Sequence, residues 1–145
     1  MDTLATLTIM DRIVFLRRVP LFAHIETADL KQIAQIASEH LYGDGDFIAR
    51  QAEIGNEMFI IMSGEVRVVV RTTESQDREL ARRQPGEVVG EMSILSQEPR
   101  MASLVAVGDV RTLTVEQRQF EGILRERPDT ALAVMRVLCA RLKES

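Results

Sequence analysis

The part of the sequence from Phe47 to Val115 consists of short apolar runs separated by turn residues. Short runs rich in Val, Ile and Phe at regular spacing are typical of the strands of a small β-barrel or jelly roll. The expected strands are 47–49, 58–62, 66–70, 78–82, 88–89, 102–107 and 110–115. Ser63-Gly64-Glu65 and Gly108-Asp109 each separate two apolar runs, so we expect a β-hairpin at each place.

Both ends of the sequence show the helical period instead. The first expected helix spans residues 4–18 and ends before Pro20. Its apolar face consists of Leu4, Leu7, Met10 and Val14. A second helix, with Thr27 as N-cap and Asp29 in its first turn, is expected to run to Ser38.

Two more helices are expected after the strands. Phe120 and Ile123 lie on the apolar face of a short one, and Pro128 suits the first position of the last helix, which runs to about Lys143. This last helix is apolar around most of its circumference, so it should contact more than one surface. The sequence therefore predicts one α+β domain over residues 1–145. Its expected parts are a helical segment 1–38, an antiparallel β-roll or jelly-roll barrel 39–115, and two C-terminal helices in 116–143.

The composition excludes several classes of protein. The net charge of −4 argues against a nucleic-acid surface, so an anionic ligand would have to be held by local groups. Cys139 is the only cysteine of the sequence, and its apolar neighbours predict a buried side chain without a disulfide, which is consistent with a reducing cytoplasm. No run is long enough to span a membrane, and residues 1–20 lack a signal-peptide pattern. We therefore expect a cytoplasmic protein without a membrane partner.

Residues 88–103 combine groups that suit a sugar phosphate. Gly90 permits a tight turn, and the N–H groups of a short helix after it, which include those of Met92 and Ser93, would attract an anion. The Arg100 guanidinium suits bidentate contact with a phosphate. The Glu91 carboxylate accepts hydrogen bonds, as sugar hydroxyls require. We call residues 88–103 the cassette.

The cassette pattern G-E-M-S-I-L-x-x-x-P-R-x-A-S resembles the phosphate-binding cassette of the cyclic nucleotide-binding domain family. The resemblance extends over residues 14–143. Gly64 and Gly86 stand where the family has glycines in its barrel turns. Two positions depart from the family pattern, because Ala52 replaces a turn glycine and Val89 replaces an aromatic residue.

The resemblance implies a ligand site and roles for its residues. The expected site residues are Gly90, Glu91, Met92, Ser93, Arg100, Met101, Val68, Leu80 and Arg141. Glu91 would accept a hydrogen bond from the ribose 2′-hydroxyl, and Arg100 would bind the exocyclic phosphate oxygens. The backbone N–H groups of Met92, Ser93 and Met101 would complete the phosphate site.

The base contacts implied by the resemblance come from Val68, Leu80 and Arg141. Arg141 also suits a second role, since an arginine in the last turn of a helix complements the helix dipole. The ligand would be cyclic AMP rather than cyclic GMP, because Met101 stands where family members that prefer the guanine nucleotide often have threonine. The implied function is a regulatory module, neither an enzyme nor a metal protein. Its last helix would close as a lid and could form a homodimer.

Alternative functions find less support in the sequence. A cupin-type enzyme needs clustered histidines, whereas His24 and His40 have no partners at ligand spacing. The Gly43–Asp46 segment lacks the later carboxylates of an EF-hand, so we expect a plain turn. A degenerate module that acts without a ligand is disfavoured because Glu91 and Arg100 are both present. A transcription regulator would add a helix-turn-helix domain after the last helix, but the sequence stops at Ser145, so we do not expect this chain alone to bind DNA.

Overall fold

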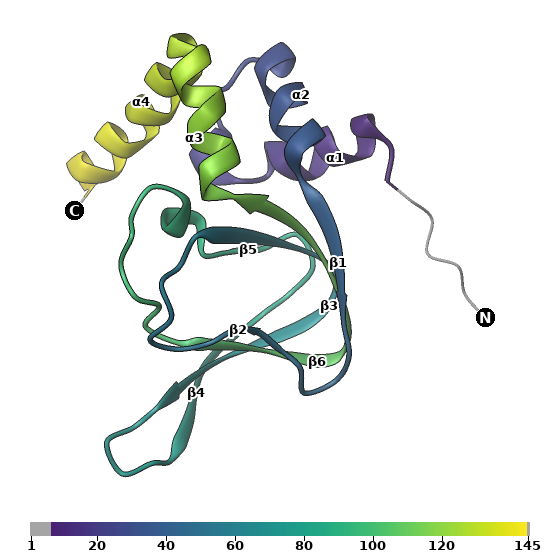
Figure 1. Cartoon of the computed structure of the whole chain (residues 1–145), viewed down its shortest axis with the longest axis vertical. Helices are drawn as coiled ribbons and strands as arrows, with labels where there is room; N and C mark the ends of the chain where they lie inside the picture. Colours follow the sequence, from purple (N-terminus) through teal and green to yellow (C-terminus); the bar gives the residue numbers. More distant parts are fainter. Residues whose placement is uncertain (1–6, 145) are drawn as a thin grey trace.

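The computed structural model of the chain describes residues 7–144, so the expected start of the first helix at Leu4 lies outside the described residues. In chain order the elements are α1 (Ile9–Arg17), η1 (Pro20–Phe22), α2 (Thr27–Ile36), β1 (Ser38–Tyr42), β2 (Phe47–Ala49), β3 (Glu57–Arg71), β4 (Asp77–Arg83), β5 (Val88–Val89), η2 (Glu91–Ile94), β6 (Ser103–Glu116), α3 (Gln117–Glu126) and α4 (Pro128–Glu144). The helices α1 to α4 gather at one end of an antiparallel β-roll (Figure 1). The predicted α+β class is confirmed.

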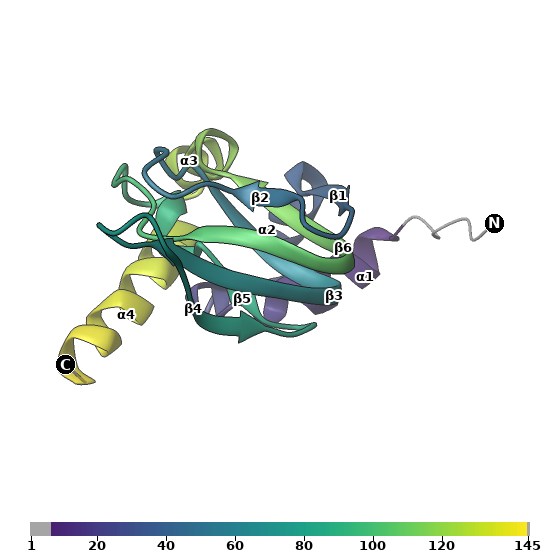
Figure 2. The same ribbon diagram turned by 90° about the horizontal axis from the view of Figure 1, so that it is seen from below.

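Two long strands, β3 and β6, form the centre of the sheet. They pair antiparallel from Glu57 opposite Glu116 to Val69 opposite Ser103. The shorter strands extend the sheet on both sides, since β1 and β2 pair with β6 while β4 and β5 pair with β3. Figure 2 shows β2, β6, β3 and β4 side by side on a face that no helix covers.

The two hairpins expected within this sheet are wrong. Ser63-Gly64 and Gly108-Asp109 lie inside the continuous strands β3 and β6, where the pairing shifts register at bulges near Ser63. Gly64 has φ +86°, and a Cβ atom there would lie 2.3 Å from the Asp109 carbonyl oxygen. The glycine therefore allows a bend and a close approach of two strands rather than a reversal of the chain.

The N-terminal helices differ from their predicted faces and ends. In α1, Ile13 and Leu16 are buried, whereas Met10 and Val14 are 66% and 55% exposed, so the predicted apolar face is wrong. The helix turns its other side to the core because α2 covers that side.

The predicted N-cap of α2 is also wrong. Glu26 holds the N-cap position without a side-chain hydrogen bond, and the Thr27 hydroxyl instead accepts from Arg17 Nη2 at 3.3 Å. The helix ends at Ile36, and Ser38 already begins β1. By contrast, Pro128 begins α4 as expected.

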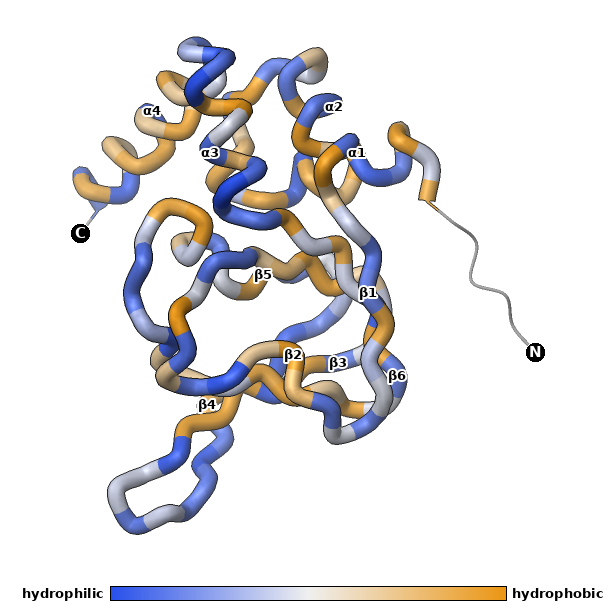
Figure 3. The backbone as a smooth tube through the Cα atoms, in the orientation of Figure 1, coloured by the Kyte–Doolittle hydropathy of each residue, from blue (hydrophilic) through white to orange (hydrophobic). Residues whose placement is uncertain are grey.

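The apolar residues form two clusters. The larger lies between the helices and the adjacent end of the roll, where Leu16, Phe22, Leu30, Ile60 and Phe120 are fully buried. The smaller lies inside the roll and consists of Phe59, Ile61, Val66, Leu104, Ala106 and Val110. Figure 3 shows hydrophobic stretches along the helices and the strands of the roll, and a mostly hydrophilic hairpin between β3 and β4.

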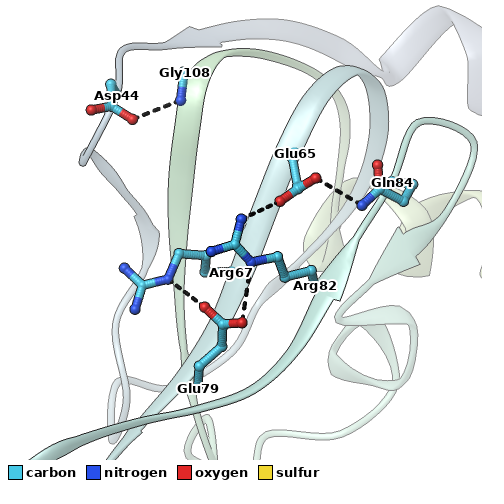
Figure 4. A network of polar contacts seen from close by, with 7 residues as sticks. All are labelled: Asp44, Glu65, Arg67, Glu79, Arg82, Gln84 and Gly108. Atoms are coloured by element: carbon cyan, nitrogen blue, oxygen red, sulfur yellow. Dashed lines mark hydrogen bonds and ion pairs between the residues drawn. The ribbon is translucent and has the colours of Figure 1, made fainter.

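Two polar features connect segments that are far apart in the sequence. The buried Asp29 carboxylate forms an ion pair with Arg127 at 2.5 Å, which ties α2 to the junction of α3 and α4. The Gly43–Asp46 segment is the turn that the sequence predicts, since Asp46 accepts from the Gly43 N–H at 2.7 Å. Asp44 accepts from the Gly108 N–H, also at 2.7 Å (Figure 4). Within residues 7–144, no helix is long and apolar enough to cross a membrane.

Candidate functional site

The cassette begins with a turn that only glycine accommodates easily. Gly90 follows β5 with φ +75° and is the N-cap of the short 3₁₀ helix η2, as the sequence predicts. A Cβ atom at this position would lie 3.0 Å from Arg100 Nη1 and 3.0 Å from the Glu57 carbonyl oxygen. Glycine is therefore required for the backbone conformation and for the close approach of the guanidinium.

Arg100 is a half-buried cation whose side-chain hydrogen bond goes to a backbone carbonyl. Its Nη2 donates to the Glu57 carbonyl oxygen at 3.0 Å, and its guanidinium carbon lies 5.4 Å from the centre of the Phe59 ring. Among residues 7–144 no carboxylate forms an ion pair with it. Burial lowers the pKa of Arg100 more than the nearby Glu57 and Glu53 raise it, yet an arginine remains charged. Its charged guanidinium can therefore form an ion pair with an anion.

The backbone of Arg100 is held by the turn at residues 50–53. The Arg100 N–H donates to the Glu53 carbonyl oxygen at 2.7 Å, and the Arg100 carbonyl oxygen accepts from the Ala52 N–H at 2.8 Å. Ala52, which replaces the family glycine, has φ +73°. The turn therefore keeps the left-handed conformation at a cost of about 1–2 kcal/mol for a residue with a Cβ atom.

Gly55 is a site residue that the sequence reasoning missed. A Cβ atom on Gly55 would lie 2.8 Å from Ser93 Oγ and 3.3 Å from Arg100 Cγ. The Gly55-Asn56 pair, typical of a turn, was the available signal. Ser93 is also engaged, because its N–H donates to the Gly90 carbonyl oxygen at 2.9 Å. Gly90, Ser93 and Arg100 thus lie together around Gly55.

A second group of predicted residues meets where α4 reaches the cassette. The Glu91 carboxylate forms a close ion pair with Arg141 Nη2, and Arg141 Nη1 lies 3.2 Å from Met92 Sδ. The other carboxylate oxygen of Glu91 accepts from the Leu21 N–H at 3.4 Å. The sequence predicted all three cassette and helix residues for the site. It did not predict the ion pair or the contact with Leu21.

The remaining predicted residues are placed differently. Val68 packs against the smaller apolar cluster inside the roll. Leu80 is 55% exposed at a bulge, where Ala81 and Glu79 pair with β3 and Leu80 does not. Met101 is 87% exposed. Among residues 7–144, no side-chain hydrogen bond or ion pair joins these three side chains to those of Arg100 or Glu91.

The sequence also led to expectations about Cys139 and about metal binding. Cys139 is exposed on α4, so its predicted burial is wrong; the apolar neighbours in the sequence lie on other sides of the helix. In the part of the chain that the structure describes, no three His, Cys, Asp or Glu side chains are grouped to hold a metal ion.

Comparison with known proteins identifies a family and similar chains. The family model described as cyclic nucleotide-binding domain matches residues 39–127. The cyclic AMP receptor protein of Thermus thermophilus is 32% identical over 126 residues, which cover 87% of this chain and 58% of that protein. The cGMP-dependent protein kinase egl-4 of Caenorhabditis briggsae is 32% identical over 112 residues, which cover 76% of this chain and 15% of the kinase.

A solved structure has the same fold. The crystal structure of the N-terminal domain of a transcriptional regulator from Streptomyces coelicolor A3(2) superposes with a TM-score of 0.83 at 27% identity, covering 90% of this chain and 93% of that domain. The two relatives are longer, and this chain spans less than two thirds of either. Because the family model covers more than half of the chain and includes the whole cassette, the chain belongs to the cyclic nucleotide-binding domain family.

Proposed function

We propose that this chain is a regulatory module that senses cyclic AMP and whose last helix responds to the ligand. The observation that carries the proposal is Arg100, a half-buried guanidinium that no carboxylate neutralises among the described residues. A cyclic nucleotide has one negative phosphate, a ribose hydroxyl and a planar base. Arg100 would bind the phosphate, and Glu91 would accept from the ribose hydroxyl.

The response would begin at the ion pair of Glu91 and Arg141. A ribose hydroxyl at Glu91 must share the carboxylate with Arg141 or displace it, so ligand binding changes the environment of α4. Within the cassette, the Ser93 N–H already donates to Gly90, which leaves the Met92 and Met101 N–H groups as the better candidates for the phosphate. A ligand shifts a helix between two positions only by its different affinity for each.

The two halves of α4 are attached differently, which supports a lid. The helix is packed against the larger apolar cluster from Ala133 to Leu138, through buried Ala133, Val134 and Val137 and partly buried Leu138. Its C-terminal end extends away from the other helices (Figure 1), and Arg141 in this end forms the ion pair with Glu91 of the cassette. The segment after Leu138 is therefore the part of α4 that we propose to move.

Titration calorimetry of the nucleotide-free chain with cyclic AMP and cyclic GMP tests the ligand. We expect cyclic AMP to bind more tightly by about tenfold or less, since one net hydrogen bond contributes roughly 0.5–1.5 kcal/mol. Met101→Thr should narrow this difference, and Met10→Thr, a matched exposed position on α1, should not. Equal affinities in the wild type would contradict the preference, and binding of neither nucleotide would contradict the function.

Hydrogen exchange tests the lid. Saturating cyclic AMP should change exchange at residues 138–142 more than at residues 130–134, because Arg141 forms the ion pair with Glu91 of the cassette. Arg141→Gln should reduce this change, whereas Arg136→Gln, an exposed arginine on the same helix, should leave it intact. If exchange in both halves of α4 is the same with and without ligand, the helix does not move on binding and the proposed lid is contradicted.

A homodimer through α4 is the partner that we propose. Leu132 and Met135 are 43% and 50% exposed, and Cys139 follows at heptad spacing on the same side. Met135→Asp should weaken self-association in sedimentation, while Arg136→Asp serves as the control. Mild oxidation should crosslink Cys139 between two copies if the helices pair in parallel. A chain that stays monomeric at all concentrations would contradict the dimer.

A further inference from the structure

A pocket of about 760 Å³ opens on the outer face of the sheet, and Ser103 is the one cassette residue that lines it. Its floor includes Phe47 of β2, Val105 of β6 and Val69 of β3. Phe47 pairs with Val105, and Val69 pairs with Ser103, two residues before Val105. Val66, Val68 and Leu104 alternate with these residues and face the inside of the roll. None of the nine predicted ligand residues lines this outer pocket. Its volume lies within the range typical of small-molecule sites.

The rim of the outer pocket is basic although the chain is acidic. Arg50, Arg67 and Arg71 line it, with Asp77 as the acidic member. Arg71 contacts Asp77 through Nε at 3.3 Å, and Arg67 contacts Glu79 through Nε at 2.7 Å. Figure 4 shows the terminal nitrogens of Arg67 directed away from Glu79. Terminal guanidinium nitrogens therefore remain as donors for an anion.

Phe47 and Arg50 give the pocket an affinity for flat groups as well. The Arg50 guanidinium carbon lies 4.0 Å from the centre of the Phe47 ring, and Phe47 is 45% exposed. A stacked guanidinium is weakly hydrated and pairs well with phosphate, while the exposed ring offers a surface for stacking. A ring next to a phosphate chain fits this combination.

The outer pocket and the cassette share the turn at residues 50–53. On the pocket side, the Gln51 N–H donates to Ser103 Oγ at 2.9 Å, and Gln51 Oε1 accepts from the Arg71 N–H at 2.7 Å. On the cassette side, Ala52 and Glu53 hold the backbone of Arg100. A ligand that displaces Gln51 or Arg71 would therefore also displace the turn at residues 50–53, which positions Arg100.

We propose that the outer pocket is a second binding site, for a phosphorylated small molecule with a planar ring, and that its occupancy changes the affinity of the cassette for cyclic nucleotide. The binding part stands on the outer pocket alone. The coupling part rests on the proposed cyclic nucleotide function.

Calorimetry with ADP and with pyrophosphate, in the presence of a chelator, tests the binding part. Arg50→Gln combined with Arg71→Gln should weaken ADP binding by about tenfold or more, the loss expected for charge-assisted hydrogen bonds. The matched control combines Arg78→Gln with Arg118→Gln, two exposed arginines outside the pocket, and should bind ADP as the wild type does. Pyrophosphate should bind more weakly than ADP because it lacks the ring.

Three results would overturn the site. They are the absence of saturable ADP binding at millimolar concentration, equal losses in the test and control variants, and loss of ADP binding in Arg100→Ala with none in the Arg50 and Arg71 variant. The last would assign ADP to the cassette.

A second titration tests the coupling. Saturating ADP should change the Kd of cyclic AMP, and saturating cyclic AMP should change the Kd of ADP by the same factor, as linkage requires. In the Arg50 and Arg71 variant, ADP should leave the cyclic AMP affinity unchanged. If ADP binds but the two affinities are independent, the coupling is wrong. If cyclic AMP does not bind while ADP does, the proposed function fails and the outer site stands.

Discussion

Arg100 and Arg82 carry the same side chain in opposite surroundings. Arg82 donates from Nη1 to Glu65 at 2.5 Å and from Nε to Glu79 at 3.1 Å, in an exposed network on the roll (Figure 4). Its hydrogen bonds to Glu79 and then Glu65 raise its pKa. Arg100 is half-buried and has a backbone carbonyl as its hydrogen-bond partner, and burial lowers its pKa.

On the proposed function, the difference separates an arginine that carboxylates already neutralise from one that a bound anion would neutralise. Arg82 has two carboxylates, so an added anion would have to displace them. Arg100 has lost part of its hydration without gaining a carboxylate, so an anion would restore favourable interactions. Charge count alone does not separate the two, but burial and the kind of partner do.

The largest expected effect follows from removing each arginine in turn. Arg100→Ala should weaken cyclic AMP binding by about 2–5 kcal/mol, or roughly thirtyfold and more in Kd, because a desolvated charge pair is lost. Arg82→Ala should leave the Kd unchanged. Calorimetry on both variants measures this directly. Similar losses in the two variants would show that the comparison does not identify the ligand arginine.

A smaller effect on nucleotide affinity and stability is expected from adding a methyl group next to Arg100, at Gly90. Gly90→Ala should destabilise the fold by about 1–2 kcal/mol from the left-handed backbone alone, and should also weaken the nucleotide because the added Cβ atom meets Nη1 of Arg100. Gly108→Ala is the control, since Gly108 has φ +67° with nothing within 4 Å of an added Cβ atom. Both should lower the midpoint of urea unfolding.

Only Gly90→Ala should change the Kd of cyclic AMP. An unchanged Kd in Gly90→Ala would mean that the position of Arg100 tolerates displacement.

The candidate site could be predicted from the sequence where its residues are neighbours in the chain. The spacing of Gly90, Glu91 and Arg100 identified the cassette because turn, acceptor and cation lie within one short stretch. The partners contributed by distant segments were not predictable: the Leu21 N–H on Glu91 and the Glu57 carbonyl on Arg100 are backbone groups. Any sequence would supply such groups, so their placement depends on the tertiary fold.

The sequence predicted the fold class correctly, but it predicted a wrong local structure where a glycine suits either a turn or a bulge within a strand. Gly64 between two apolar runs predicts a turn locally, yet β3 continues through it, because the long partner β6 pairs on both sides of the bulge. The burial of Cys139 was inferred from neighbours in sequence, but on α4 the buried positions are Thr130, Ala133, Val134 and Val137. In both cases the tertiary partner decides between two locally acceptable readings.

A stabilising change tests the turn that supports Arg100. Ala52→Gly should raise stability by about 1 kcal/mol, because glycine removes the cost of the left-handed conformation, while its greater entropy in the unfolded chain offsets part of this gain. For a chain of this length that corresponds to roughly 3 °C in Tm. Ser75→Gly, with φ 61° in the β3–β4 connection, is the control for the same backbone strain away from the cassette.

Both variants should melt higher, and only Ala52→Gly should alter the Kd of cyclic AMP. A decrease in Tm for Ala52→Gly would show that the alanine methyl contributes packing that outweighs the strain.

The smallest effect is expected from acid titration of the exposed network around Arg82. Hydrogen bonds lower the pKa of Glu65, through Gln84 and then Arg82, and that of Glu79, through Arg82 and then Arg67, below the ordinary value of 4.5. Because the folded-state pKa values lie below the unfolded ones, the network stabilises the fold above pH 4.5, and this contribution disappears as the pH falls through the lowered values. Urea unfolding across this pH range should therefore show a shallower loss of stability in Arg82→Ala than in the wild type. Arg100→Ala should follow the wild-type slope, because Arg100 has no carboxylate ion pair among the described residues. A steeper acid dependence in Arg82→Ala would contradict the assignment of Arg82 as the structural member of the pair.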